Sequence, residues 1–308
     1  MDSLLQKLTI TIPVYNEARY VVRTVESCIG QAGKIVLYDN CSTDGSSELC
    51  ADLAKRYPEV THIRHSENIG AFENFKIPVF ECQTEYMALV GAHDILGPDY
   101  SIQILREMEK DPEIALAAGT IIPIDENEKH LKPVTRADWA NETKDCSPLV
   151  RAGTAAVKLR KICLMYYGVY RTAKFREAWF DTPCLGYDRI MLLRTAVVGK
   201  LIYVPGATFY GRILDASRDS KTDRERRAKI IGHSRAKPLQ KDNFLRNKVM
   251  IETILSQTHT LDDLSLALQY IHTIDKRYQR RRHYQKRRLI KIVASILLAL
   301  LLAILAIH

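Results

Sequence analysis

Short apolar segments alternate with helical patterns from residue 8 to residue 90, and this alternation restricts the possible folds more than any other feature of the chain. Strands that alternate with helices of about 10–15 residues form right-handed crossovers and a mostly parallel sheet. We therefore expect an α/β fold with a Rossmann-like, mostly parallel sheet flanked by helices. The expected strands are 8–14, 34–38, 60–64 and 86–90, and the helices between them cover about 18–31, 46–56 and 71–82.

Polar residues follow three of these strands, namely Asn16-Glu17, Asp39-Asn40 and His93-Asp94. In sheets of this kind, ligands bind beyond the carboxyl ends of the strands. We therefore expect the three pairs to converge on one edge of the sheet and to form a binding site there.

Two common nucleotide motifs can be excluded. No G-x-G-x-x-G segment follows a strand, so a dinucleotide-binding Rossmann domain has no support. The segment 30–34 has the wrong glycine spacing for a phosphate-binding P-loop, and Ile35 replaces the Ser or Thr that such a loop needs.

The remaining body has weaker patterns, and we expect it to add further strands and helices to the same fold. Residues 123–150 are polar and irregular, which is typical of a variable loop. The other expected elements are a helix over 98–110, a strand over 114–122, an apolar and aromatic segment over 155–171, a turn over 182–187, a helix to about residue 198, a short strand over 200–204 and one or two amphipathic helices over 239–275.

Four segments of the first half resemble, in order and spacing, the signature blocks of family 2 glycosyltransferases of the GT-A fold. They are LTITIPVYNEARYVVRTVES, IVLYDNCSTDGSSELC, ENIGAFENF and YMALVGAHDILGPDY. The resemblance covers about residues 7–120, and 180–217 more weakly. It implies a nucleotide-sugar-binding half at 1–120, an acceptor and catalytic half of the same domain at 121–217, and a helical extension at 218–275.

The resemblance also implies roles for single residues of the first half. The turn of Pro13, Tyr15, Asn16 and Glu17 would lie against the base and ribose of the nucleotide, and Asp39 would accept a hydrogen bond from one of them. Asn40, Asn68 and Asn74 would complete the nucleotide-sugar site. Independently of any ligand, Gly70 suits a tight turn, and Ser42, Thr43 or Asp44 suits the cap of the next helix.

The family carries metal-binding carboxylates after its fourth strand, but here the segment is Gly91-Ala92-His93-Asp94. Asp94 is the carboxylate that remains. His93 would be a second metal ligand, a hydrogen-bond donor to phosphate or a neutral residue. A divalent cation, Mg²⁺ or Mn²⁺, would stabilise the departing nucleoside diphosphate, and one carboxylate together with substrate oxygens and water can hold it.

The second half is expected to supply the catalytic base. Asp188 opens an apolar helix, where the resemblance implies the base, although an N-cap Asp would have the same pattern. Asp181 and Glu177 are the alternatives. Arg212 follows the last strand in a segment that resembles the family's aromatic-arginine block, and it would contact the diphosphate of the donor.

The positive charge of the chain is concentrated near its C-terminus. The formal net charge is +9, and the nine basic residues of 276–291, a stretch without acids, account for all of it. The apolar run 292–307 follows and would span roughly 24 Å as a helix, close to the hydrocarbon core of about 30 Å. We expect 276–308 to form a basic collar and a hydrophobic membrane anchor, with the catalytic body on the cytoplasmic face and no nucleic-acid partner. An odd number of cysteines, seven, and the absence of C-x-x-C pairs agree with a cytosolic body.

These features together predict an inverting glycosyltransferase that moves a sugar from a nucleotide-diphosphate sugar to a hydroxyl acceptor, a lipid-linked or cell-surface glycan intermediate. The Q-x-x-R-W block associated with processive polymerisation is absent from the body, which favours addition of a single sugar. The alternative is a catalytically degenerate, membrane-anchored nucleotide-sugar-binding or scaffold protein. A nucleotidyltransferase would need a glycine-rich first turn with Arg or Lys, which the chain lacks.

Overall fold

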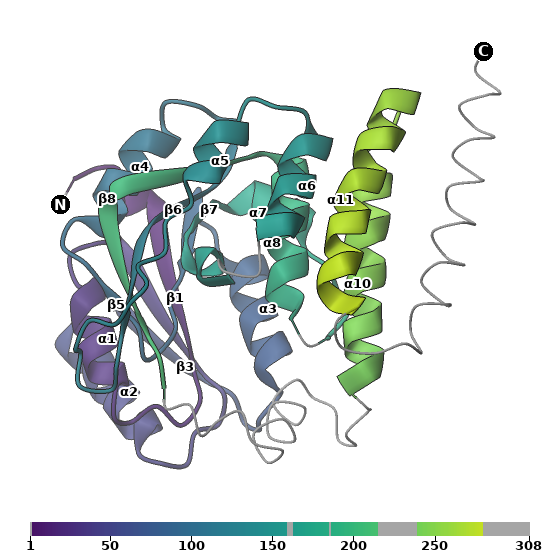
Figure 1. The fold of residues 1–308 in the computed structure, drawn as a ribbon. Coiled ribbons are helices and arrows are strands. Elements are labelled where there is room, and N and C mark those ends of the chain that lie inside the picture. The colour runs from purple at the N-terminus through teal and green to yellow at the C-terminus, as the bar shows by residue number, and fades with distance from the viewer. Residues whose placement is uncertain (1, 159–162, 185, 215–238, 280–308) are drawn as a thin grey trace.

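Eight strands form one sheet, in the order β3-β2-β1-β4-β7-β6-β8-β5 (Figure 1). The computed structural model describes residues 2–158, 163–184, 186–214 and 239–279. The strands are β1 Leu8–Val14, β2 Lys34–Asp39, β3 Val60–Arg64, β4 Tyr86–Leu89, β5 Ile95–Leu96, β6 Ile114–Ile124, β7 Val169–Arg171 and β8 Lys200–Arg212.

The sheet is mixed rather than mostly parallel. Strands β3, β2, β1 and β4 are parallel to one another, as predicted for the first half of the chain, and β6 is parallel to β8. Strand β7 runs antiparallel to both β4 and β6, and β5 runs antiparallel to β8. The short strand β7 joins the two parallel parts, so the sheet is parallel within each part, as predicted, and β7 and β5 are the antiparallel strands that make it mixed.

Helices cover both faces of the sheet because its strands are apolar on both sides. In β4, Tyr86 and Ala88 belong to one core, whereas Met87 and Leu89 belong to the other. Helices α1, α2 and α4 pack on the first core, and α3, α5 to α8, α10 and α11 pack on the second. The helices are α1 Val21–Cys28, α2 Ser46–Arg56, α3 Ala71–Glu81, α4 Tyr100–Met108, α5 Asp138–Thr143, α6 Pro148–Lys158, α7 Thr172–Ala178, α8 Tyr187–Val198, α10 Leu239–Leu255 and α11 Leu261–Gln279, with 3-10 turns at Leu5–Lys7 and Cys163–Tyr167.

The segment 123–150, predicted to be an irregular loop, contains helix α5 and the start of α6. Trp139 and Leu149 are buried in the second core, with exposed fractions of 6% and 1%. These two apolar side chains fix the segment on the sheet although its composition is polar. The loop prediction is therefore wrong for the second part of this segment.

Where the sequence predicts one or two helices over 239–275, the structure has two, α10 and α11, and they lie against α6 and α8 (Figure 1). Within the ranges described, no helix is both long and apolar enough to cross a membrane. The predicted anchor lies outside the described residues from residue 280 onward.

Candidate active site

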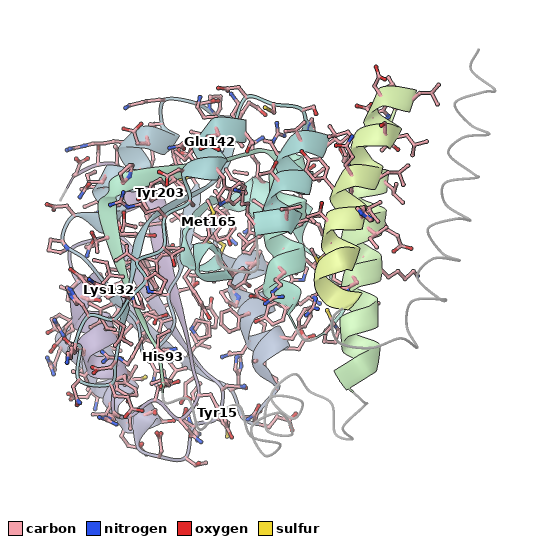
Figure 2. The ribbon with its side chains drawn as sticks, viewed as in Figure 1. Tyr15, His93, Lys132, Glu142, Met165 and Tyr203 are labelled. Atoms are coloured by element: carbon pink, nitrogen blue, oxygen red, sulfur yellow. The ribbon has the colours of Figure 1, made fainter. Side chains whose placement is uncertain are left out.

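Three turns meet at the carboxyl edge of the parallel strands, as the sequence predicts. The backbone N–H of Asn16, after β1, donates to Ser42 Oγ at 3.0 Å, and Asn16 Oδ1 accepts from the N–H of Thr43 at 2.9 Å. The turn after β4 joins them, because His93 Nδ1 lies 3.0 Å from Glu17 Oε1. Figure 2 shows Tyr15 and His93 on the same edge of the molecule. These contacts confirm that the polar segments converge.

Asp44 holds the turn between β2 and α2 in place. Its Oδ1 accepts from the N–H of Ser46 at 3.1 Å, and its Oδ2 accepts from the N–H of Ala18 at 3.1 Å. Gly45, between Asp44 and Ser46, has a φ of 96°, which glycine adopts without steric cost. The N-cap residue of α2 is thus Gly45 rather than Ser42, Thr43 or Asp44. Asp44, just before it, accepts from the N–H of the first helical residue and ties the β2 turn to the β1 turn.

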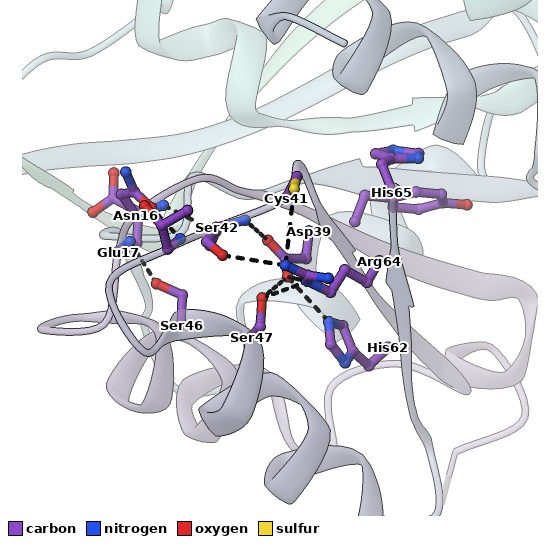
Figure 3. Close-up of polar contacts among 12 residues, drawn as sticks. Asn16, Glu17, Asp39, Cys41, Ser42, Ser46, Ser47, His62, Arg64 and His65 are labelled. Carbon is purple, nitrogen blue, oxygen red and sulfur yellow. Dashed lines mark hydrogen bonds and ion pairs between the residues drawn. The ribbon is translucent and has the colours of Figure 1, made fainter. Parts of the chain in front are cut away.

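Asp39, the last residue of β2, is fully buried, with an exposed fraction of 0% (Figure 3). Its Oδ1 accepts from the N–H of Ser42 at 2.9 Å, and its Oδ2 accepts from the hydroxyl of Ser47. Arg64 Nε and His62 Nε2 each lie 3.5 Å from the same Oδ2. Burial raises the pKa of Asp39, but the hydrogen bonds from the two serines outweigh burial and hold this pKa below its ordinary value of 3.8. The carboxylate thus stabilises the turn, and its contact with a nucleotide stays a prediction.

Asparagine side chains fix the turn that precedes α3. Asn40 Nδ2 donates to Asn68 Oδ1 at 2.9 Å, and Asn40 Oδ1 accepts from the N–H of Ile69 at 2.9 Å. Gly70 has φ of 85°, which confirms the tight turn expected there. Asn74 is 2% exposed and donates to a backbone carbonyl of β2 at 3.0 Å. These asparagines shape the edge of the sheet, and their contact with a ligand stays a prediction.

Tyr15 is the exposed aromatic residue of the first turn, with an exposed fraction of 39%, and it follows Pro13 and Val14 at the end of β1. An exposed ring at this edge can stack on a planar ligand, because aromatic side chains bury much apolar area with little loss of conformational freedom. Its geometry is therefore compatible with the base contact that the sequence predicts.

The turn after β4 directs Asp94 into the protein. This side chain is 2% exposed, and its Oδ1 accepts from the N–H of Arg212 at 2.8 Å. A Cβ atom at Gly91 would lie 2.5 Å from Asp94 Oδ2, so the carboxylate fills the space that a side chain at position 91 would need. Burial raises the pKa of Asp94, because it penalises the charged form.

The expected metal site at this turn does not fit the structure. Asp94 faces inward, and His93 is held through Nδ1 by Glu17. Within the part of the chain that is described, no group of three or more His, Cys, Asp or Glu side chains is placed to hold a metal ion. The prediction that Asp94 and His93 bind Mg²⁺ or Mn²⁺ is therefore not supported.

Arg212 is enclosed as well, with an exposed fraction of 6%. Its Nε donates to the carbonyl of His93 at 2.8 Å, its Nη1 donates to the carbonyl of Asp125 at 3.0 Å, and its Nη2 lies 3.2 Å from Glu128 Oε1. The guanidinium carbon lies 4.8 Å from the centre of the Tyr20 ring. The predicted contact with a diphosphate would require these bonds to break. In this structure Arg212 joins the β4 turn to the segment after β6.

Asp188 lies in the first turn of α8 and is half-buried. Among the described residues its carboxylate has no hydrogen-bond or ion-pair partner. The rings of Phe72, in the first turn of α3, and Tyr187 meet edge to face at 5.4 Å, so the two helices begin side by side. The alternative Asp181 is exposed and pairs with Lys76 at 2.6 Å. Asp188 thus lies near the edge of the sheet where the other site residues gather.

Arg64 and Ser47 belong to this site, although no motif in the sequence singles them out. Arg64 Nε donates to Ser47 Oγ at 2.9 Å, and both contact the carboxylate of Asp39. In the sequence, Ser47 looks like an ordinary residue of the first turn of a helix. Arg64 looks like an ordinary charged residue at the end of an edge strand. The available signal was the position of Arg64 at a strand end, on the edge where the other strand ends meet.

The two-sided α/β sheet with these turns at its carboxyl edge defines the class of GT-A-type folds. Within that class the chain belongs to glycosyl transferase family 2, because the sequence model of that family matches residues 9–172.

Curated relatives share parts of this region. Glycosyltransferase GlyG of Streptococcus pneumoniae is 27% identical over 114 residues, which are 35% of this chain and 38% of that protein. Glycosyltransferase GlyA of the same organism is 26% identical over 218 residues, 68% of this chain and 31% of that protein. Chondroitin synthase of Escherichia coli is 30% identical over 122 residues, 38% of this chain and 18% of that protein. The matches thus span less than half the length of each of these relatives.

Solved structures confirm the fold. Residues 1–349 of S. aureus TarS, in complex with UDP-GlcNAc, superpose with a TM-score of 0.55 at 10% identity, covering 87% of this chain and 80% of that one. The same fragment in complex with UDP gives a TM-score of 0.53 at 11% identity, covering 91% and 93%. The confirmed part of the fold prediction is therefore a GT-A-like α/β fold with a mixed sheet flanked by helices.

Proposed function

We propose that the chain is an inverting glycosyltransferase, which moves a sugar from a nucleotide-diphosphate sugar to a hydroxyl group of an acceptor. The observation that carries the proposal is the edge contact of Phe72 with Tyr187, at 5.4 Å. It brings the start of α8, with Asp188, beside the start of α3 and the turns that follow the parallel strands. A base and a donor site on one edge are what a single displacement requires.

The donor is proposed to lie over the turns after β1, β2 and β4. Tyr15 offers an exposed ring for the base, and Asn16, Asn40 and Asn68 fix the loops around it. The likeness to TarS, which was solved with UDP-GlcNAc and with UDP, supports a nucleotide-sugar donor. Family membership and the glycosyltransferases GlyG and GlyA support sugar transfer as the reaction.

Asp188 is proposed to act as the general base. It takes the proton of the acceptor hydroxyl, whose oxygen attacks the anomeric carbon from the face opposite the nucleoside diphosphate. The bond from that carbon to the diphosphate oxygen breaks in the same step, and the nucleoside diphosphate leaves. A carboxylate without a partner among the described residues is suited to this role, because no hydrogen bond must break before it accepts a proton.

For His93, hydrogen bonding to a phosphate oxygen is the role we favour among the three that the sequence left open. Glu17 holds its Nδ1 at 3.0 Å, and the side chain is 28% exposed. An imidazole oriented by a carboxylate can stabilise negative charge at a fixed position.

We further propose that the acceptor is a lipid-linked or cell-surface glycan intermediate and that the protein works at the cytoplasmic face of a membrane. The nine basic residues of 276–291 and the apolar run 292–307 support this placement. A membrane-held transferase meets lipid-linked acceptors at the surface where they reside.

The Asp188→Asn variant tests the proposed base. We expect transfer to fall by at least about a hundredfold, because an amide cannot accept the proton. Nucleotide binding should stay close to that of the wild type, because Asp188 faces the acceptor. The measurement is turnover with radiolabelled nucleotide sugars, after thermal shift has identified the donor that stabilises the protein.

Asp181→Asn is the matched control, since Asp181 lies on the same segment but is exposed and paired with Lys76. Its turnover should match that of the wild type. If Asp188→Asn retains more than about a tenth of wild-type turnover, the assignment of the base is wrong, and a loss in Asp181→Asn would move it to that residue.

The replacement of the family's carboxylates by Gly91 and His93, together with the inward position of Asp94, favours one second candidate. This candidate is a degenerate, membrane-anchored protein that binds nucleotide sugars without transferring them. Purified wild-type protein that binds a nucleotide sugar but neither hydrolyses nor transfers it, with any acceptor fraction, would establish this function instead.

A further inference from the structure

Side-chain oxygens of the turns after β1, β2 and β3 are turned toward the protein. Asn16 Oδ1 accepts from the N–H of Thr43, and Asn40 Oδ1 accepts from the N–H of Ile69, both at 2.9 Å. Asn68 Oδ1 accepts from the side chain of Asn40, also at 2.9 Å. Internal hydrogen bonds thus engage the acceptor oxygen of each of these three side chains.

The carboxylate of Asp39 is equally engaged. Both of its oxygens accept hydrogen bonds, from Ser42 and Ser47, and it is 0% exposed. A carboxylate has about four acceptor positions, and these two donors with Arg64 and His62 surround it. It cannot accept a hydrogen bond from a base while this arrangement lasts.

Arg64 lies beside Asp39 (Figure 3) and, unlike Asp39, is exposed. Its side chain is 48% exposed. Nε donates to Ser47 Oγ at 2.9 Å, and Nη2 lies 3.5 Å from the carbonyl of Ser42 and 3.8 Å from Cys41 Sγ. These contacts fix the plane of the guanidinium at the turn after β2, while Nη1 makes no hydrogen bond among the described residues.

We propose that Arg64, in place of Asp39, recognises the base of the donor nucleotide, and that this base carries a keto oxygen, as uracil, thymine and guanine do. The inference rests on the proposed function, since it assumes that a nucleotide lies over the turn after β2. A guanidinium only donates hydrogen bonds, so it needs an acceptor on the base. Guanine O6 and N7 suit such a fork, whereas the amino edge of adenine suits an Asn or Gln side chain with a free oxygen.

Binding of four nucleoside diphosphates to the full-length protein in detergent tests the proposal. UDP, dTDP, GDP and ADP are titrated calorimetrically against wild type, Arg64→Gln and Arg64→Lys. We expect at least one keto-base diphosphate to bind the wild type about tenfold or more tightly than ADP. Arg64→Gln should lose most of this preference, and Arg64→Lys should keep part of it, because lysine retains the charge toward Asp39 but not the planar fork.

Arg56→Gln is the matched control, because the side chain of Arg56 is 47% exposed and pairs with Glu26 away from the turns. It should leave all four affinities unchanged. ADP binding as tight as that of every keto-base diphosphate would overturn the inference, as would an unchanged preference in Arg64→Gln. If Arg64→Gln does not fold, as judged by circular dichroism, an unchanged preference in Arg64→Lys overturns it. If none of the four diphosphates binds, the proposed function is overturned as well. If they bind without the expected preference, only the inference about Arg64 is overturned.

Discussion

Gly91 shows, at the scale of single residues, how the absence of one side chain directs another. A Cβ atom at position 91 would lie only 2.5 Å from Asp94 Oδ2, so the carboxylate of Asp94 occupies the space that such an atom would need. Asp94 Oδ1 accepts a hydrogen bond from the N–H of Arg212 at 2.8 Å. The glycine at position 91 therefore leaves room for Asp94 to turn inward.

The Gly91→Ala variant should accordingly be less stable than the wild type. The new methyl group displaces Asp94 Oδ2, which weakens the hydrogen bond to the buried N–H of Arg212 and costs about 1–3 kcal/mol. Urea denaturation followed by circular dichroism measures this loss. In an Asp94→Ala background the same change should cost clearly less, since the clash is then absent. Equal costs in the two backgrounds would contradict the proposed coupling.

Residue types and strand ends predicted where the site lies, but not which atoms face a ligand. Asn16, Glu17 and His93 meet as expected from their positions after β1 and β4. The inward direction of Arg212 depends on partners far along the chain, namely the carbonyl of Asp125 and the carboxylate of Glu128. Such long-range hydrogen bonds leave no local pattern in the sequence, so the exposure of a polar side chain could not be predicted.

At the scale of secondary-structure elements, prediction succeeded where local signals agree. The bounds of β1, α2 and β3 match the expected ranges, because an apolar run or a helical pattern ends there at turn residues. The three-residue strand β7 is too short to show a period. The expected strand 200–204 continues to Arg212, since a register shift between Gly119 and Thr120 of β6 accommodates the segment with Pro205 and Gly206.

At the contact of α6 with α11, a glycine leaves room for an aromatic ring. A Cβ at Gly153 would lie 2.3 Å from the ring of Tyr270. We expect Gly153→Val to push α11 away and to lower the free energy of unfolding by about 1–3 kcal/mol, the usual cost of overpacking. Thr154→Val, a β-branched change at the next, half-buried position of α6, is the control and should stay within about 0.5 kcal/mol. Equal stabilities of the two variants would mean that the helices separate without cost.

At the scale of the whole molecule, two cores lie on the two faces of one sheet, and the C-terminal helices belong to one of them. Met250 and Ile254 of α10 and Ile271 and Ile274 of α11 are buried in the core that also contains α6 and α8. Residues 239–274 are therefore needed to complete the body of the protein. The basic collar predicted from residue 276 begins just after the last of these buried side chains.

This boundary makes two truncations informative. Deletion of 276–308 removes none of the buried apolar side chains described in α11, so the shortened protein should fold and bind nucleotide like the full-length chain. It should also leave the membrane fraction, because the proposed anchor is gone, whereas the full-length protein should need detergent rather than high salt for release. Deletion from residue 239 onward should unfold the protein, because it exposes the core under α6 and α8. Loss of nucleotide binding in the shorter deletion would show that the tail is part of the core, and a full-length protein found in the soluble fraction would refute the anchor.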